Sequence, residues 1–169
     1  MFPKRLPCRL AVILFPSILL FTGCRSAQSY IDKGNAAFAK GHFNEATLDY
    51  RKAAQKNPSL GDAYYRAGLS ELKENKPAEA LQDLQQALHL MPDNLAARAD
   101  LTNLLLGAYI GDPKRPKFLY DLLVKFSREW LTKDANSMQG LRIEGYLAML
   151  EQRPDEAVNE FRRAHQLYP

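Results

Sequence analysis

The side chains that could do chemistry are few in this sequence, and their spacing matches no common catalytic or metal-binding pattern. The 169 residues include three histidines, His42, His89 and His165, and none has another His or Cys at i+3 or i+4, as a metal-binding pattern would. Two cysteines cannot form a disulfide framework or a four-thiolate metal site. The carboxylates are spread along the chain, which favours solvated faces and intrahelical pairs. We therefore predict no enzyme, no cofactor and no metal, and leave open a catalytic constellation assembled only by folding.

Cys24 is the residue with a predicted covalent chemistry, because of the segment in front of it. Residues 1–10 contain three cations and no carboxylate, and residues 11–21 carry no charge. Thr22 and Gly23 are small. A charged start, a short apolar run and small residues before a cleavage point are typical of a secretory signal peptide. A helix that spans a membrane needs about 20 apolar residues, so this apolar run is too short to be a good transmembrane anchor.

Thr22-Gly23-Cys24 resembles a bacterial lipobox, with Phe21 where that family usually has Leu. The resemblance implies that a diacylglycerol alkylates the Cys24 thiol, and that cleavage removes residues 1–23 and leaves 24–26 as a short lipid-anchored linker. Arg25, where an Asp would signal inner-membrane retention, favours the outer membrane facing the periplasm. Two alternatives stay open: an ordinary cleaved signal with an incidental cysteine, and an uncleaved anchor.

The positive charge of the chain belongs mostly to this first segment. The net charge is +4, with 23 Lys and Arg against 19 Asp and Glu. Without Lys4, Arg5 and Arg9, 20 basic side chains face 19 acidic ones. We therefore predict no nucleic-acid partner, because such partners are bound through concentrated basic patches.

The rest of the chain repeats itself with a period of 34 residues. Gly34 and Gly68 are 34 residues apart, and so are Ala46 and Ala80. Pro58 and Pro92 follow the same period. A third copy with the same internal spacing stands at the end of the sequence, at Gly145, Ala157, Phe161, Ala164 and Pro169. Fixed periods of this length indicate stacked supersecondary units.

These marks resemble the tetratricopeptide repeat (TPR), in which a Trp-x₂-Leu-Gly-x₂-Tyr segment precedes Ala-x₃-Phe and a closing Pro. Tyr30, Tyr64 and Leu141 occupy the Trp position, while Lys33, Ala67 and Glu144 replace the usual Leu. The resemblance implies an all-α, right-handed solenoid of about four helix pairs over residues 27–169. Its units are 27–60, 61–94, an irregular 95–137 and 138–169. The positions that define the repeat are Gly34, Ala46, Tyr50, Pro58, Gly68, Ala80, Pro92, Gly145, Ala157 and Phe161.

Each mark has a physical role in a helix pair. Small Gly34 and Ala46 allow the two helices of one unit to approach closely, and Tyr50 fills the space beside them. Gly41 and Asn75 tolerate the left-handed turn with which a helix often stops, and Gln152 is the third residue at that place. Pro77 and Pro154 are predicted to open second helices, where a missing N–H costs nothing. Glu79 and Glu156 lie in first turns, where the helix dipole favours anions.

The third unit is nine residues longer than the others, since Gly68 and Gly145 are 77 residues apart. We predict helices over about 95–110 and 118–132, separated by a turn at 111–113. Phe118, Leu122, Phe126 and Trp130 are interpreted as one apolar stripe. The stripe is either buried in the stack, which we favour, or faces a partner or a membrane.

Repeat arrays of this kind bind peptides or helices on the concave side lined by the first helices. By register with the family, ten residues are expected to form this groove: Asn35, Phe38, Tyr65, Arg66, Leu69, Lys73, Asp100, Asn103, Arg142 and Tyr146. The carboxylate clamp of chaperone-binding relatives is not expected here. Ile31, Ala96 and Asp100 stand where that clamp requires Lys or Arg.

The resemblances together imply a membrane-tethered scaffold of the bacterial envelope that binds other envelope proteins, in envelope assembly, pilus biogenesis or exopolysaccharide export. A soluble periplasmic adaptor and the repeat region of a longer envelope enzyme are the alternatives. Ala157, Val158, Phe161 and Ala164 leave the outer side of the last helix partly apolar. We therefore expect further repeats or a partner to cover that end.

Overall fold

The described part of the chain is entirely helical. The structure is a computed structural model that describes residues 26–167, and these residues form eight helices and no strand. Cys8, Cys24, Arg25 and Pro169, with the predicted signal segment, lie outside the described residues. The helices are α1 (Ala27–Ala39), α2 (Phe43–Lys56), α3 (Gly61–Lys73), α4 (Pro77–Leu90), α5 (Leu95–Gly111), α6 (Lys117–Lys133), α7 (Met138–Leu150) and α8 (Pro154–Leu167).

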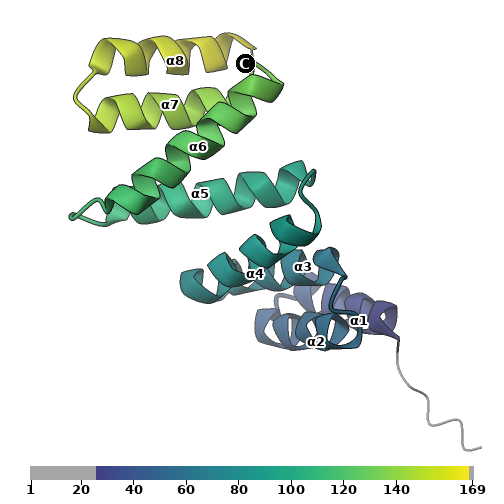
Figure 1. Cartoon of the computed structure of the whole chain (residues 1–169). Coiled ribbons are helices and arrows are strands. Elements are labelled where there is room, and N and C mark those ends of the chain that lie inside the picture. The colour runs from purple at the N-terminus through teal and green to yellow at the C-terminus, as the bar shows by residue number, and fades with distance from the viewer. Residues whose placement is uncertain (1–25, 168–169) are drawn as a thin grey trace, which may run out of the picture.

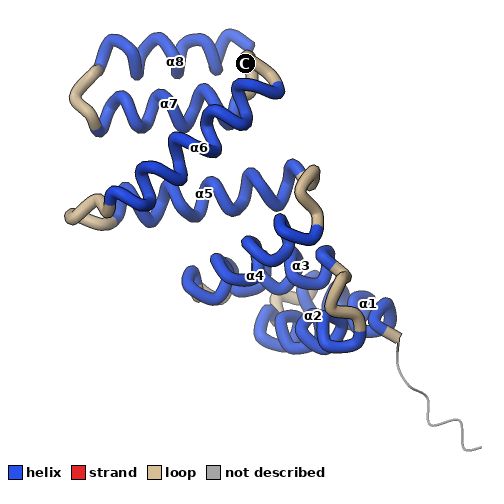
Figure 2. The backbone as a smooth tube through the Cα atoms, in the orientation of Figure 1, coloured by secondary structure: helices blue, strands red, loops and turns tan. Residues whose placement is uncertain are grey.

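The helices stack as hairpins in chain order (Figure 1). Extensive packing occurs between helices that are consecutive in sequence, and it is tightest within α1–α2, α3–α4 and α7–α8. The exception is the third hairpin, in which α6 crosses α5 obliquely and their contact is the sparsest of any consecutive pair (Figures 1 and 2). The predicted all-α solenoid of four helix pairs is confirmed.

Two separate clusters of buried side chains support the stack. The alanine cluster joins α1, α2 and the start of α3, and consists of Ile31, Ala37, Ala46, Tyr50, Ala53, Ala54, Ala63 and Ala67. The leucine cluster joins α4 to α7, and consists of Leu84, Leu101, Leu105, Leu106, Tyr109, Leu119, Leu123, Phe126, Trp130, Ile143 and Leu147. The second half of the described chain therefore buries much larger side chains than the first.

The turns inside three of the hairpins share one backbone geometry. Two residues after the end of each first helix stands a residue with positive φ: Gly41 at 78°, Asn75 at 58° and Gln152 at 59°. In the first hairpin His42 N donates to Ala37 O, and Gly41 N donates to Phe38 O. The other two hairpins repeat this pair of bonds. All three are Schellman turns, and Gln152 adopts the left-handed conformation without the freedom of glycine.

Replacing Gln152 with glycine is therefore expected to stabilise the protein by about 1 kcal/mol, because a side chain in the left-handed region costs about that much. Thermal unfolding followed by circular dichroism measures the gain. Gly41→Ala is the reverse change at the equivalent position, where a Cβ would touch nothing within 4 Å. It should lose a similar amount from backbone conformation alone. A fall in melting temperature for Gln152→Gly would contradict this account.

The nine extra residues of the third unit are distributed over both helices and their turn. Helix α5 has 17 residues against 13 in α1, α3 and α7. Helix α6 has 17 against 14 in α2, α4 and α8. The turn between them, residues 112–116, is two residues longer than the others. Each helix thus gains about one turn, which keeps its buried face in register.

The interpretation of Phe118, Leu122, Phe126 and Trp130 as one buried stripe is wrong. Phe118 is 68% exposed, whereas Phe126 and Trp130 are 8% and 7% exposed. Four residues advance a helix by about 400°, so positions spaced by four drift about 40° per step around the axis. Over three steps Phe118 turns away from the core. The buried face follows Leu119, Leu123, Phe126 and Trp130 instead, in steps of four and three.

Candidate binding groove

Close contact between the two helices of a hairpin fixes the position of its first helix. A Cβ built on Gly34 would lie 2.4 Å from Tyr50 Cε1, and one on Gly145 would lie 2.7 Å from Phe161 Cε1. In the second hairpin Leu84 takes the place of the ring, 2.9 Å from a Cβ on Gly68. The three glycines therefore allow the second helix to pack directly against the backbone of the first.

The first predicted groove residue, Asn35, links two hairpins. Its Oδ1 accepts a hydrogen bond from the Tyr50 hydroxyl at 2.9 Å and another from Arg66 Nη1 at 3.0 Å. Arg66 also donates from Nε to Asp62 Oδ2 at 2.7 Å, one turn earlier on α3. Because Tyr50 is fully buried, it holds the Asn35 amide, and Asn35 in turn orients the Arg66 guanidinium.

Two further contacts continue this pattern along the first helices. The Tyr65 hydroxyl on α3 donates to Asp100 Oδ2 on α5 at 2.9 Å. Burial and this hydrogen bond raise the pKa of Tyr65 to about 12, so the hydroxyl remains a donor at any working pH. Arg142 Nη2 on α7 donates to Asn103 Oδ1 on α5. We call the three linked pairs Asn35–Arg66, Tyr65–Asp100 and Asn103–Arg142 the polar ladder.

The structure places the other four predicted groove residues in different settings. Phe38 packs edge-on against Phe43 with ring centroids 5.2 Å apart, and Tyr146 packs likewise against Phe161. Leu69 is half-buried on α3. Lys73, one turn beyond Leu69, is exposed and has no ion-pair partner among the described residues. The predicted groove thus combines the polar ladder with aromatic edges and one free cation.

The pairing within the ladder went unpredicted. Its partners are 31, 35 and 39 residues apart, close to the length of the repeat that separates them. A search for complementary side chains about one period apart would have found all three pairs. The Asp62–Arg66 contact has a simpler signal, since opposite charges at i and i+4 share a helix face.

A pair of carboxyl groups lies where α2, α3 and α4 meet. Glu71 on α3 is 1% exposed, and its Oε1 is 2.6 Å from Arg51 Nη2 on α2. Asp83 on α4 lies 3.6 Å from Arg51 Nε. Burial, and next the negative charge of Asp83, raise the pKa of Glu71 to about 7, and burial also raises the pKa of Asp83. Among the described residues, Glu71 Oε2 and Asp83 Oδ2 have no hydrogen-bond partner.

This carboxyl pair should make the protein less stable as the pH rises. The folded pKa of Glu71, about 7, is above the ordinary value of 4.5, so its contribution is complete below about pH 4.5 and is lost through about pH 7. At about pH 8, Glu71→Gln should exceed the wild type in unfolding free energy by about 2–3 kcal/mol. Urea titrations at several pH values measure the difference. The exposed control Glu79→Gln should keep the wild-type pH profile, and a Glu71→Gln profile parallel to wild type would refute the assignment.

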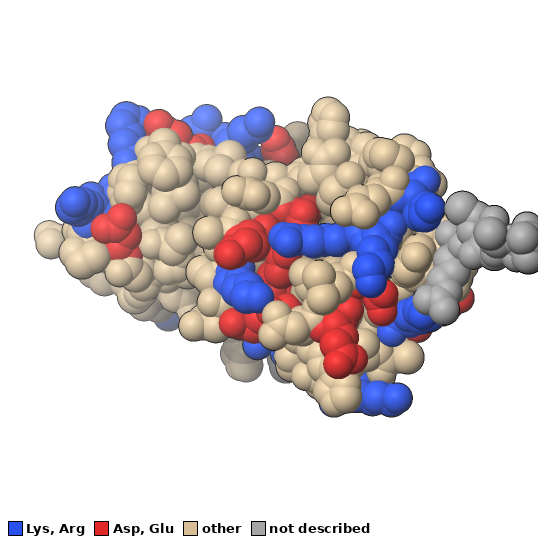
Figure 3. Space-filling view, turned by 90° about the horizontal axis from the view of Figure 1, so that it is seen from below, with Lys and Arg blue, Asp and Glu red and all other residues tan. Residues whose placement is uncertain are grey.

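Charges of both signs are mixed on the surface near α1–α4. Figure 3 views the molecule from that end and shows Lys and Arg beside Asp and Glu, without a large area of one sign. Among residues 26–167, no group of three or more His, Cys, Asp or Glu could hold a metal ion. In the same range no helix has the length and hydropathy to cross a membrane.

Comparisons with known proteins place similar sequences over much of the chain. Two family models, both described as tetratricopeptide repeat, match residues 27–59 and 71–122. Sperm-associated antigen 1 of Rattus norvegicus is 35% identical over 65 residues, which is 38% of this chain and 7% of that protein. The chain therefore corresponds to a small part of that relative.

Solved structures resemble the whole stack. The crystal structure of MamA gives a TM-score of 0.67 at 18% identity, and the match covers 83% of this chain and 77% of that chain. YrrB, described as a TPR protein with an unusual peptide-binding site, gives 0.65 at 20% identity, over 85% of this chain and 69% of that chain. At these identities the likeness shows the fold alone.

Proposed function

We propose that this chain, as an array of tetratricopeptide repeats, binds a peptide or helix of another envelope protein on its first helices. Arrays with this fold generally mediate protein–protein interaction. The partner belongs to a bacterial envelope system, such as one for envelope assembly, pilus biogenesis or exopolysaccharide export. The N-terminal lipid on Cys24 holds the array at the membrane.

The polar ladder is the observation that carries this proposal. Asn35, Arg66, Tyr65, Asp100, Asn103 and Arg142 come from four successive first helices, and each pair bridges neighbouring hairpins. Their geometry is fixed before a ligand arrives, which lowers the entropy cost of binding. Amide, hydroxyl and guanidinium groups repeated along one face suit the regularly spaced N–H and C=O groups of a peptide.

Lys73 adds a preference for a ligand with a negatively charged group. It is exposed on the face of α3 that carries Tyr65 and Leu69, at steps of four residues, and no carboxylate of the described residues neutralises it. A negatively charged group of the partner would gain a charge-assisted contact there. The described peptide site of YrrB, a protein of the same fold, supports peptide binding as the activity.

Affinity capture from detergent-solubilised envelopes tests the groove. The tagged wild type should retain a defined envelope complex, and Lys73→Glu should lose most of it, by about tenfold or more. The matched control is Arg162→Glu, which makes the same change of charge at an exposed position on α8. Capture that is equal for all three proteins would overturn the groove, and equal thermal stability of the variants excludes misfolding as the cause.

Tethering has its own test. Palmitate should label the wild type in cells but not Cys24→Ala, and the labelled protein should fractionate with the outer membrane. Each buried CH₂ contributes about 0.8 kcal/mol, so more than one acyl chain gives stable anchoring. Confinement to a surface raises the effective concentration for partners on that surface. Labelling that persists in Cys24→Ala, or that fails in the wild type, would remove the tether from the proposal.

A further inference from the structure

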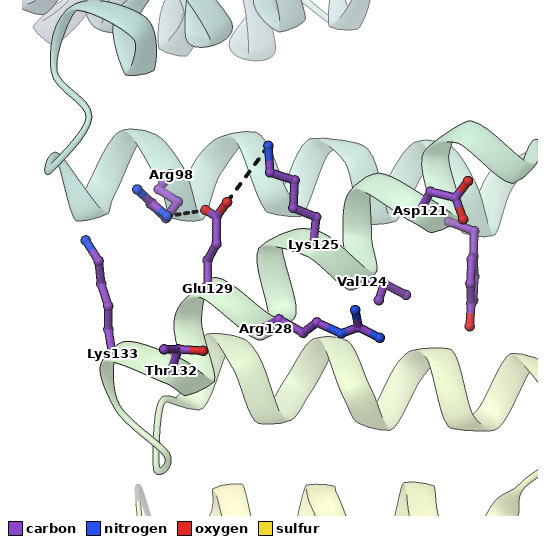
Figure 4. Close-up of a pocket in the computed structure, with 9 residues that line it drawn as sticks. Arg98, Asp121, Val124, Lys125, Arg128, Glu129, Thr132 and Lys133 are labelled. Atoms are coloured by element: carbon purple, nitrogen blue, oxygen red, sulfur yellow. Dashed lines mark hydrogen bonds and ion pairs between the residues drawn. The ribbon is translucent and has the colours of Figure 1, made fainter.

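A cavity of about 830 Å³ opens along α6, where that helix crosses α5 obliquely. Arg98 of α5 forms one wall, and the rest comes from α6 between Tyr120 and Lys133 (Figure 4). None of the ten predicted groove residues lines it. It therefore belongs to the second helix of its hairpin, and is separate from the polar ladder on the first helices.

The charges around this cavity are unbalanced. Arg98, Lys125, Arg128 and Lys133 line it, against two carboxylates, Asp121 and Glu129. Both carboxylates are already engaged, and so is Lys133, whose Nζ lies 3.4 Å from Asp93 Oδ1 outside the cavity. Glu129 Oε2 lies 2.5 Å from Arg98 Nη1, and its Oε1 is 4.0 Å from Lys125 Nζ. Asp121 accepts bonds of 2.7 and 2.8 Å from Lys117 Nζ, a further cation just outside the cavity.

Arg98 is a built part of the site rather than a mobile surface cation. It is 8% exposed, and its Nη2 donates to Pro92 O at 2.8 Å. Its guanidinium carbon lies 5.9 Å from the centroid of the Trp130 ring. The buried Nε has no hydrogen-bond partner among the described residues. The positive wall is thus held in place by the core, with one donor of Arg98 still unsatisfied.

Arg128 supplies the free positive charge, while Lys125 shares Glu129 with Arg98. Arg128 is exposed and has no ion-pair partner in the described chain, and in Figure 4 it points away from Glu129, along α6 toward Val124. Val124 and Tyr120 are half-buried one and two turns before Arg128, so apolar surface adjoins the cations. A ligand that fits must therefore carry carboxylates and apolar side chains in one short segment.

We propose that this cavity is a second binding site, which takes an acidic, amphipathic peptide segment of a partner protein independently of the groove. Charge complementarity selects the segment: its carboxylates pair with Arg128 and Lys125, and its apolar side chains cover Val124 and Tyr120. Two sites on different faces allow the array to hold two segments at once, as a protein that joins partners requires.

A direct titration tests the site. The probe is a fluorescein-labelled dodecapeptide of repeated Glu-Leu-Glu-Ala, added to the full chain in detergent and followed by fluorescence anisotropy. Arg128→Glu should weaken its binding by about tenfold or more, because it replaces an attraction with a repulsion. Salt at about 0.5 M should weaken wild-type binding, since exposed charges are screened.

Matched variants separate this site from general electrostatic attraction. Lys33→Glu and Arg162→Glu make the same change of charge at exposed positions on α1 and α8, outside both sites, and both should leave peptide affinity within about twofold. Equal loss in all three variants would mean general electrostatic attraction and would overturn the site. So would Arg128-dependent binding to phosphatidylglycerol vesicles with no peptide binding, because the cavity would then face a membrane. If Lys73→Glu abolishes envelope capture, and Arg128→Glu is the variant that weakens binding of the labelled peptide, the two sites are distinct.

Discussion

Gly34→Val should lower the free energy of unfolding by about 3 kcal/mol, the cost of forcing extra carbon atoms into a packed contact. The first added carbon would already lie 2.4 Å from Tyr50 Cε1. The ring cannot move aside easily, because Tyr50 is 2% exposed and its hydroxyl is bonded to Asn35. The two helices of the first hairpin must separate instead. Urea unfolding followed by far-ultraviolet circular dichroism measures the loss.

Gly107→Val is the control for this prediction. Gly107 also lies inside a helix, α5, but a Cβ there would meet nothing within 4 Å. Valine has a better helix propensity than glycine, so Gly107→Val should leave stability unchanged or raise it by a few tenths of a kcal/mol, on the order of the propensity difference. Tyr50→Ala should make Gly34→Val less harmful than it is alone, because the clashing ring is gone. A similar loss at both glycines would contradict the packing role of Gly34.

Trp130→Ala should cost about 3–5 kcal/mol, the usual range for deleting a large buried aromatic side chain. Trp130 is the only tryptophan, is 7% exposed, and belongs to the leucine cluster. Its loss also removes the ring over which the Arg98 guanidinium lies, 5.9 Å from the centroid. Urea titration of the variant, again by circular dichroism, gives the change. The loss should be concentrated in α5–α7.

Phe118→Ala is the control, because it deletes an exposed aromatic side chain from the same helix. Phe118 is 68% exposed, so its removal should change stability by less than about 0.5 kcal/mol. Trp130→Phe keeps an apolar ring and removes an indole N–H that has no hydrogen-bond partner among the described residues, so it should lose much less stability than Trp130→Ala. If Phe118→Ala were as damaging as Trp130→Ala, the assignment of the buried face of α6 would be wrong.

The repeat fold could be predicted because the residues that define it act locally and recur at a fixed spacing. Gly34, Gly68 and Gly145 stand at equivalent places, and the period alone predicts that each opposes one side chain of the next helix. Pro77 and Pro154 begin α4 and α8 for a reason that acts within one turn. Such signals do not depend on how the hairpins are placed relative to each other, so the sequence suffices to find them.

The features that the sequence did not predict depend on the angles at which the helices pack, and the repeat period carries no information on these angles. The drift of about 40° per four residues turns Phe118 outward, and only the true packing angle of α6 decides which of its faces is buried. The cavity between Arg98 and Arg128 exists because α6 crosses α5 obliquely. In the sequence, Glu71 and Asp83 look like ordinary carboxylates on helix surfaces. The packing of α2, α3 and α4 brings both of them to Arg51.

The unequal size of the two clusters matters for the order in which the chain is synthesised. The alanine cluster, made mostly of the smallest apolar side chains, leaves the ribosome first, while the leucine cluster with its aromatic rings is completed only when α7 follows. Burial of a large side chain stabilises more than burial of alanine, since the gain follows the area removed from water. We therefore expect the first hairpins to be incompletely stabilised until their later neighbours have been synthesised. During synthesis, the chain is then expected to reach its full stability only after α7 has been completed.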